Sequence, residues 1–115
     1  MKQAVTLKKN HEFQRMYKKG KSAAGSCMVL YCRKNNLGRN RLGLTASVKL
    51  GKAVKRNRCR RRMREVYRLH TPVLKTGWDI ILVARGRLIG APWKEVNDTF
   101  LRLCRKLDLL EDQTC

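Results

Sequence analysis

Apolar residues recur along the chain with two periods, one typical of helices and one typical of strands. Residues 10–19 carry Phe13, Met16 and Tyr17 at positions i, i+3 and i+4, so three apolar side chains share one helical face. Gly20 follows directly, and glycine is common just after the last turn of a helix. The pattern predicts a first amphipathic helix over residues 10–19.

Two stretches after this helix alternate with the period of a strand. Residues 26–33 are apolar at both odd and even positions, so we expect both faces of this strand to be covered. A second strand over residues 41–48 follows a turn at residues 35–38, and the two predict an antiparallel hairpin. A further short strand near residues 21–25 precedes them in this interpretation.

The second half predicts a long helix, a buried strand and a final helix. Residues 52–69 form a helix with an apolar face and an opposite polar face. The apolar face carries Cys59, Met63, Val66, Tyr67 and His70, and the polar face carries Asn57, Arg61, Arg64 and Arg68. Residues 78–84 are a β-branched apolar run typical of a buried strand. Residues 92–107 predict a last helix, with an apolar stripe of Trp93, Val96, Phe100, Leu103 and Leu107.

The order of elements predicts an α+β protein of type αβββαβα, a sandwich in which helices pack on one central sheet. The length of 115 residues is typical of one domain, here spanning residues 1–115. We expect residues 108–115 to form a loosely held tail.

Charge is distributed very unevenly along this fold. There are 28 Lys and Arg residues against 8 Asp and Glu residues, which gives a formal net charge of +20. Between Phe13 and Arg64 there are 17 basic residues and no acidic one. Repulsion within such a surface opposes compaction unless a polyanion neutralises it. The sequence therefore predicts a polyanionic partner rather than a merely solvated surface, which would mix both signs of charge.

The highest density of basic residues falls on the predicted central helix, where 8 of the 13 residues from Lys52 to Arg64 are basic. The apolar face of this helix distinguishes it from a disordered basic tail. We therefore expect it to dock on the sheet with its arginines outward. Arginine presents a planar fork of donors that pairs with phosphate in a bidentate manner. Gly51 at the helix start permits close approach to free backbone N–H groups, which favours an anion there.

Other residue types with chemical potential give weaker signals. The five cysteines are odd in number and form no CxxC pair, so we expect reduced thiols, several of them small core residues, rather than disulfides or a zinc site. His11 and His70 are the only histidines, and a protein nuclease could use such a pair as acid and base, although structural roles are the simpler interpretation. Carboxylates do not cluster, so Mg²⁺ in the basic half would need phosphates of a polyanionic partner as ligands.

Targeting signals are not evident in the sequence. No stretch approaches the roughly 20 apolar residues that span a bilayer, and the first ten residues lack the apolar centre of a secretory signal. The sequence therefore predicts a cytoplasmic protein with no membrane partner.

The basic segment resembles the signature of the bacterial ribonuclease P protein family. The Arg-Asn-Arg motif of that family stands here as Arg56-Asn57-Arg58, preceded by Gly51-x-Ala53-Val54. Weaker matches extend over most of the chain, at Phe13, Gly20, Arg41-Leu42-Gly43 and residues 80–84. One departure from the pattern is visible: the family often has two lysines after the serine, whereas here Ser47 is followed by Val48 and then Lys49. Tyr17 stands where the family often has phenylalanine, which keeps an aromatic face.

The resemblance implies a fold that general rules would not predict. Members of this family, whose fold is like that of domain 2 of ribosomal protein S5, have a left-handed βαβ crossover around the central helix. Such crossovers are normally right-handed.

The resemblance also implies a division of labour in a ribonucleoprotein that removes the 5′ leader from precursor tRNA. The catalyst is the RNA subunit, which uses bound Mg²⁺, and the protein alone has no catalytic residue. The resemblance further implies a protein monomer in a 1:1 complex with this RNA. Its cleft between the first helix and the sheet binds the precursor's leader. The matching cleft positions are Phe13, Tyr17, Val29 and Tyr31. The positions that match an RNA-binding or phosphate-binding role are Lys49, Lys52, Arg56, Asn57, Arg58, Arg60, Arg61, Arg64 and Arg68.

Three alternatives stay open on the residues alone. The aromatic residues of the cleft could be plain core packing. The whole chain could be a basic structural protein of the ribosomal type that binds rRNA without any catalytic assembly. It could also be a DNA-binding protein that places the basic helix in a major groove, although only Asn57 on that helix is suited to reading bases.

Overall fold

The computed structural model describes residues 5–6 and 10–111. Its strands are β1 (Val5–Thr6), β2 (Lys21–Ala24), β3 (Met28–Lys34), β4 (Arg41–Thr45) and β5 (Trp78–Ala84). Its α-helices are α1 (Asn10–Lys19), α2 (Ala53–His70) and α3 (Trp93–Lys106), and three short 3-10 helices are η1 (Val48–Leu50), η2 (Thr71–Val73) and η3 (Gly86–Ile89). The predicted elements are therefore present, with the two-residue strand β1 in addition.

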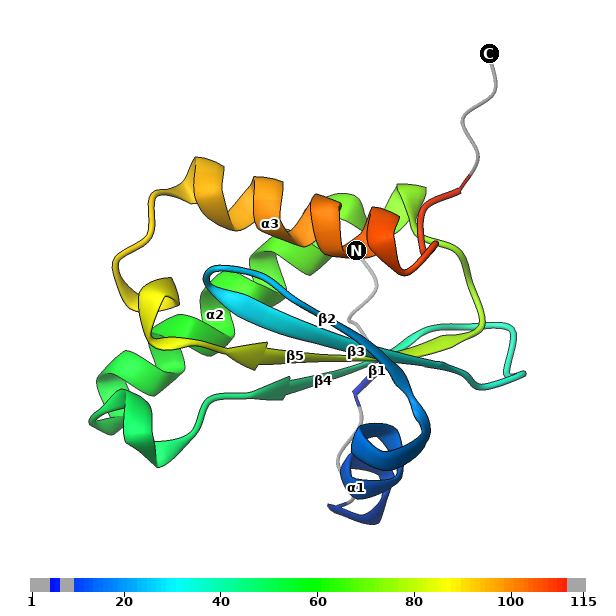
Figure 1. The fold of residues 1–115 in the computed structure, drawn as a ribbon, viewed down its shortest axis with the longest axis horizontal. Helices are drawn as coiled ribbons and strands as arrows, with labels where there is room; N and C mark the ends of the chain where they lie inside the picture. The colour runs from blue at the N-terminus through cyan, green and yellow to red at the C-terminus, as the bar shows by residue number, and fades with distance from the viewer. Residues whose placement is uncertain (1–4, 7–9, 112–115) are drawn as a thin grey trace.

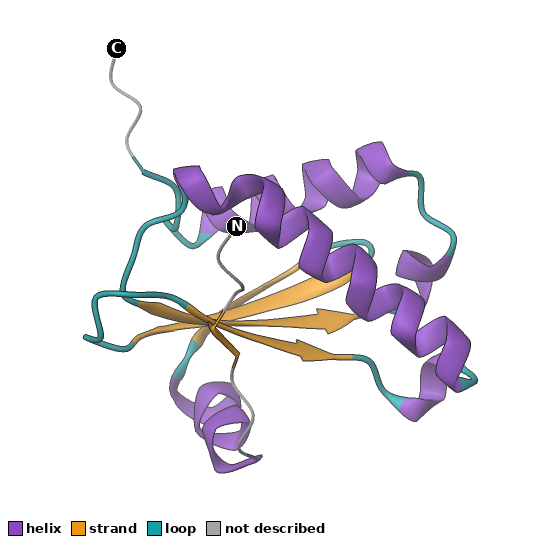
Figure 2. Ribbon diagram, turned by 180° about the vertical axis from the view of Figure 1, so that it is seen from behind, coloured by secondary structure: helices purple, strands orange, loops and turns teal. Residues whose placement is uncertain are grey.

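Helices cover both faces of one sheet whose strand order is β1-β4-β5-β3-β2. Helix α1 packs on one face, and α2 and α3 lie side by side over the other (Figures 1 and 2). This arrangement confirms the predicted α+β class.

The alternation within β3 explains why both faces are covered. Met28, Leu30 and Cys32 are fully buried and belong to the main core beneath α2 and α3. Val29 and Tyr31 point to the opposite face and are half-buried. There Tyr31 packs against a smaller apolar cluster formed by Met16 of α1 and Ile81 of β5.

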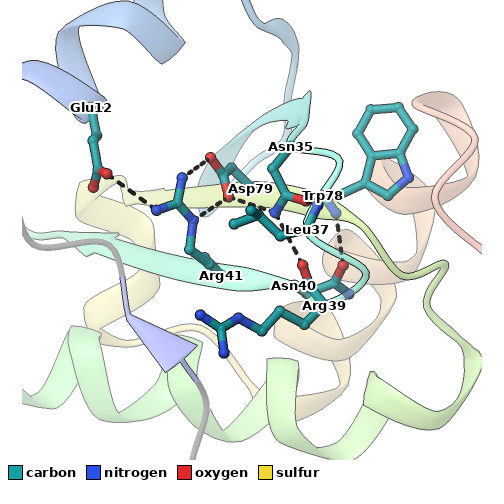
Figure 3. A network of polar contacts seen from close by, with 8 residues as sticks. All are labelled: Glu12, Asn35, Leu37, Arg39, Asn40, Arg41, Trp78 and Asp79. Atoms are coloured by element: carbon teal, nitrogen blue, oxygen red, sulfur yellow. Dashed lines mark hydrogen bonds and ion pairs between the residues drawn. The ribbon is translucent and has the colours of Figure 1, made fainter.

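The predicted hairpin between β3 and β4 was wrong, because β5 lies between them. β5 pairs antiparallel with β3 and parallel with β4. Two asparagines fasten the connection between β3 and β4 around the start of β5. The Asn35 side chain donates to Asp79 at 2.8 Å, and the Asn40 side chain accepts from the Trp78 amide at 2.9 Å (Figure 3). The turn residues 35–38 predict only a local reversal of the chain, and they give no sign that β5, about 40 residues later, lies between the two strands.

The parallel pair β4 and β5 is joined by α2 in a left-handed crossover. Seen from the side of α2 with the strands pointing upward, β5 lies to the left of β4 (Figures 1 and 2). The resemblance implied this handedness, whereas the general rule favours the opposite one.

Helix α2 buries its predicted face, since Cys59, Met63, Val66 and Tyr67 are buried and His70 is half-buried. Helix α3 buries Val96, Phe100 and Leu103 as expected, but its first residue does not follow the predicted stripe. Trp93 is 40% exposed, although Ala91 before it and Val96 after it are buried.

The segment that we expected to be loose from residue 108 instead packs against the body as far as residue 111. Leu109 is fully buried, and its carbonyl accepts from the Lys75 amide at 2.7 Å. Glu111 donates its amide to the Val73 carbonyl at 2.7 Å. Residues 112–115 of the predicted tail lie outside the described residues.

Within residues 5–6 and 10–111, no helix combines the length and the apolar character needed to cross a membrane.

Candidate RNA interface

The polar face of α2 is a row of solvent-exposed arginines. Arg58, Arg61 and Arg64 are exposed, and within the described part of the chain no hydrogen bond or ion pair occupies their guanidinium groups. These groups recur on successive turns, so their positive charges repel one another. The face can bind anions at several points along its length.

Two arginines of α2, Arg56 and Arg62, bind backbone carbonyl groups of the fold. Arg62 extends sideways and donates to two backbone carbonyls, that of Leu88 at 2.7 Å and that of Ala91. Arg56 donates from Nε to the Ala46 carbonyl at 3.1 Å. These two arginines therefore hold α2 against the rest of the fold, and Arg56 keeps only its terminal nitrogens for a ligand.

Three further predicted residues, Asn57, Arg60 and Arg68, have partners within α2 itself. Arg60 donates to the side-chain oxygen of Asn57 at 3.1 Å. Arg68 forms hydrogen bonds and an ion pair with Glu65, three residues before it, and the hydrogen bond from Arg68 lowers the pKa of Glu65. The basic face is thus least compensated between Arg58 and Arg64 and weakens toward the end of the helix.

The approach to α2 is a rigid turn that carries exposed lysines. The Ser47 hydroxyl accepts the Lys49 amide at 3.2 Å and caps η1. Gly51 then adopts φ of +124°, a conformation that residues with a Cβ rarely take. Lys49 and Lys52 are both exposed on this turn, so they extend the positive surface beyond the first residue of α2.

The residues of the predicted aromatic cleft lie on the opposite face of the sheet, on the side of α1. The rings of Tyr17 and Tyr31 meet edge to face with centroids 4.8 Å apart. Tyr17 is 42% exposed, whereas Tyr31 and Val29 are half-buried. The aromatic surface can therefore accept a planar ligand while part of it supports α1.

Phe13 differs from these residues because its ring rests on the backbone of β4. A Cβ placed at Gly43 would lie 2.8 Å from Phe13 Cζ, so only glycine admits the ring at this depth. Phe13 is half-buried and packs against Met16 and Ile81. Its position fits a structural support of the cleft more closely than a freely exposed platform.

A polar network fixes the other end of α1 (Figure 3). Arg41 of β4 forms a bidentate pair with Asp79 of β5, with Nε–Oδ1 at 2.8 Å and Nη2–Oδ2 at 2.7 Å. Its remaining Nη1 donates to Glu12 of α1 at 3.1 Å. Burial of Asp79 would raise the pKa of this carboxyl, but hydrogen bonds from Arg41 and Asn35 outweigh it and hold the pKa below the ordinary value.

The cleft and the basic segment meet at the end of β4. The Tyr17 hydroxyl lies 3.4 Å from the Thr45 hydroxyl, on the side of α1. The next residue, Ala46, accepts Arg56 of α2 through its carbonyl. Two consecutive residues thus connect a site on one face of the sheet to a site on the other, although α1 and α2 lie on opposite sides.

Sequence reasoning missed Arg41, Asp79 and Thr45 as parts of this region. One signal was available, because Asp79 is a lone carboxylate at the start of an apolar strand and such a group needs a partner when buried. Its partner, Arg41, could not be identified without knowing that β4 and β5 are neighbours.

The alternative chemistry considered for the protein is not assembled among the described residues. His11 is exposed on α1, whereas His70 lies on the far side of the sheet with Nε2 2.6 Å from Asn97 Oδ1. Cys27, Cys32, Cys59 and Cys104 are free and buried, and burial raises the pKa of the Cys32 thiol to about 11. Residues 5–6 and 10–111 contain no group of three His, Cys, Asp or Glu residues placed to hold a metal ion. Cys115 lies outside the described residues.

Fold and site together define a small α+β protein with an arginine-rich helix on one side of its sheet and a partly exposed tyrosine pair on the other. The family model for ribonuclease P matches residues 1–108. The chain belongs to the ribonuclease P protein family. It is therefore a protein subunit of ribonuclease P, the enzyme that processes tRNA.

Similar proteins and structures support this assignment over nearly the whole chain. The ribonuclease P protein component of Thermoanaerobacter sp. (strain X514) is 44% identical over 91% of this chain and 90% of its own. That of Alkaliphilus oremlandii is 41% identical over 96% of both. The structure of the Staphylococcus aureus RNase P protein has a TM-score of 0.83 at 33% identity, covering 95% of this chain and all of that one. The RNase P protein from Thermotoga maritima has a TM-score of 0.78 at 31% identity, covering 87% and 96%.

Proposed function

We propose that the chain binds the RNA of ribonuclease P through η1 and the exposed face of α2, and that the cleft beneath α1 binds the single-stranded 5′ leader of precursor tRNA. The observation that carries the first half is the set of exposed guanidinium groups of Arg58, Arg61 and Arg64. These groups lie on a helix whose opposite face is packed, so the backbone positions from which they extend are fixed before a ligand arrives.

Phosphates are the ligands that such a surface favours. Each phosphate removes repulsion between neighbouring arginines, and the counterions released from the RNA add to the free energy of binding. The planar guanidinium groups can each take two phosphate oxygens. Lys49 and Lys52 would extend this contact, while Arg56 would serve both the fold and the RNA.

The leader half of the proposal is supported by the surroundings of Tyr17 and Tyr31. Single-stranded RNA offers unstacked bases, and stacking on an aromatic side chain contributes about 1–3 kcal/mol per base. A leader that lies across the cleft reaches the end of β4, where Thr45 and Ala46 connect the cleft to α2. One RNA assembly can thus contact both sites.

The protein's contribution in this proposal is binding and orientation. The chemistry belongs to the RNA subunit, and Mg²⁺ supplies charge compensation at the scissile phosphodiester when RNA phosphates hold it. The described residues offer no ligand cluster for that ion, so no step is assigned to a metal on the protein. We further propose that one copy of the chain acts with one RNA in the cytoplasm.

Reconstitution tests the proposal. The chain is added to bacterial ribonuclease P RNA at low Mg²⁺, and leader removal from precursor tRNA is followed by gel electrophoresis. We expect the protein alone to cleave nothing and to raise the rate when the RNA is present. An unchanged rate of leader removal would refute the proposal. Mature tRNA, which carries no leader, serves as the control and should stay uncut.

A further inference from the structure

The two most exposed large hydrophobic side chains of the described chain both lie in the basic segment. Val54 is 80% exposed and Val48 is 73% exposed. They stand on either side of Gly51, in η1 and in the first turn of α2. Side chains so exposed contribute little to the core, and a β-branched residue is less favourable in a helix than alanine or lysine. Neither the packing nor the helix explains two valines here.

The segment that carries them is anchored to the fold by three contacts. Ser47 caps η1, and Leu50 turns inward against the main core. Arg56 then fastens the start of α2 to Ala46. Because the turn is held at both ends, Val48 and Val54 project into solvent from a fixed platform, at little further cost in conformational entropy on binding.

Helix geometry places Val54 on the face that we assign to RNA. Asn57, Arg58 and Arg61 follow it at i+3, i+4 and i+7, and all of them are exposed. Val48 has the exposed Lys49 as its neighbour. The apolar side chains are therefore surrounded by cations, and a partner for them must be negatively charged overall and locally apolar.

We propose that Val48 and Val54 contact unpaired nucleobases of the ribonuclease P RNA, so that the basic segment recognises exposed bases as well as phosphates. An unpaired nucleotide combines the two required properties, since its base presents an apolar π-face beside an anionic phosphate. The inference rests on the proposed function, because it concerns the same surface and the same RNA.

The test replaces both valines by threonine, which keeps the β-branched shape and exchanges a methyl group for a hydroxyl. Binding of Val48→Thr/Val54→Thr to ribonuclease P RNA is compared with the wild type over a series of salt concentrations. Heparin is the second probe, because it is a polyanion without bases. Leu37→Thr is the matched control, since Leu37 is 51% exposed in the loop between β3 and β4, at the opposite end of the sheet (Figure 1). Circular dichroism and thermal unfolding check that each variant folds.

We expect the double variant to bind the RNA about tenfold more weakly at every salt concentration, because two apolar methyl groups are lost from the contact. The slope of log affinity against log salt should stay unchanged, as should the salt concentration that elutes the protein from heparin. Leu37→Thr should match the wild type on both probes. Unchanged RNA affinity of the double variant, or an equal loss on heparin, overturns the inference while the proposed function stands. A wild-type protein that does not bind the RNA overturns both.

Discussion

The phenol rings of Tyr17 and Tyr31 are inclined by 69° to each other, with their centroids 4.8 Å apart. Tyr31 lies on β3, and Tyr17 contacts it from α1. The pair therefore connects α1 to the sheet and also forms the aromatic surface of the proposed leader cleft. A ligand that stacks here meets one ring by its face and the other by its edge.

Replacing Tyr31 by alanine should weaken binding of leader-bearing precursor tRNA to the reconstituted holoenzyme by about tenfold, because one stacking surface is lost. Affinity for mature tRNA should hardly change. Equilibrium binding of both RNAs gives the ratio of the affinity for precursor tRNA to the affinity for mature tRNA. Equal losses on the two would indicate a general RNA-binding surface of the ribosomal type instead.

Gly43→Ala tests whether the position of α1 sets the cleft. The new methyl group would lie 2.8 Å from Phe13 Cζ, so Phe13 and with it α1 must move outward. We expect a destabilisation of about 1–3 kcal/mol in urea unfolding, together with weaker binding of the leader. Ala is tolerated at Gly86, where a Cβ meets nothing within 4 Å, so Gly86→Ala is the control. Equal behaviour of the two variants would contradict this account of Phe13.

The ion pair of Arg41 with Asp79 predicts a pH-dependent stability. The pKa of Asp79 is lower in the folded protein than its ordinary value of 3.8. The ionised Asp79 therefore contributes fully to the folding stability above pH 3.8, and this contribution is lost as the pH falls through the pKa of the folded state. Asp79→Asn should cost about 2 kcal/mol at pH 6 and clearly less at pH 2.5. Urea unfolding of both proteins at the two pH values measures this. If the difference in unfolding free energy between the wild type and Asp79→Asn does not depend on pH, an ionised Asp79 is not its cause.

Arg62 and Arg61 are neighbours on α2 that should separate stability from binding. Arg62→Gln removes two hydrogen bonds to the carbonyls of Leu88 and Ala91, so we expect a loss of about 1–3 kcal/mol of unfolding free energy. Arg61→Gln should leave thermal unfolding unchanged and reduce RNA affinity. The reverse pattern would mean that the exposed row is structural.

Local elements of the fold could be predicted because their signals are local. Phe13, Met16 and Tyr17 determine the face of α1, and Cys59, Met63 and Val66 determine that of α2, through spacing within one helix. The pairing of strands could not be predicted in this way. β5 lies between β3 and β4 and is bound there by the side chains of Asn35 and Asn40. In the sequence these two asparagines look like ordinary turn residues, because their partners on β5 are not known.

The candidate site shows the same division. Exposure of Arg58, Arg61 and Arg64 follows from helical periodicity, and the structure confirms it. The separate tasks of Arg56 and Arg62 depend on carbonyl groups 10 and 26 residues away in sequence, which a pattern cannot locate. The handedness of the β4–α2–β5 crossover came from the family resemblance alone. The RNA-binding and leader-binding roles of the individual residues stay predictions.

The salt dependence of binding to ribonuclease P RNA tests most directly whether the outward arginines of α2 hold phosphates. The wild type is compared with Arg61→Gln/Arg64→Gln, whose two guanidinium groups are exposed and have no role in the fold of the described residues. We predict that the slope of log affinity against log salt becomes shallower by about two for the double variant, with unchanged thermal stability. A slope equal to that of the wild type would contradict the account.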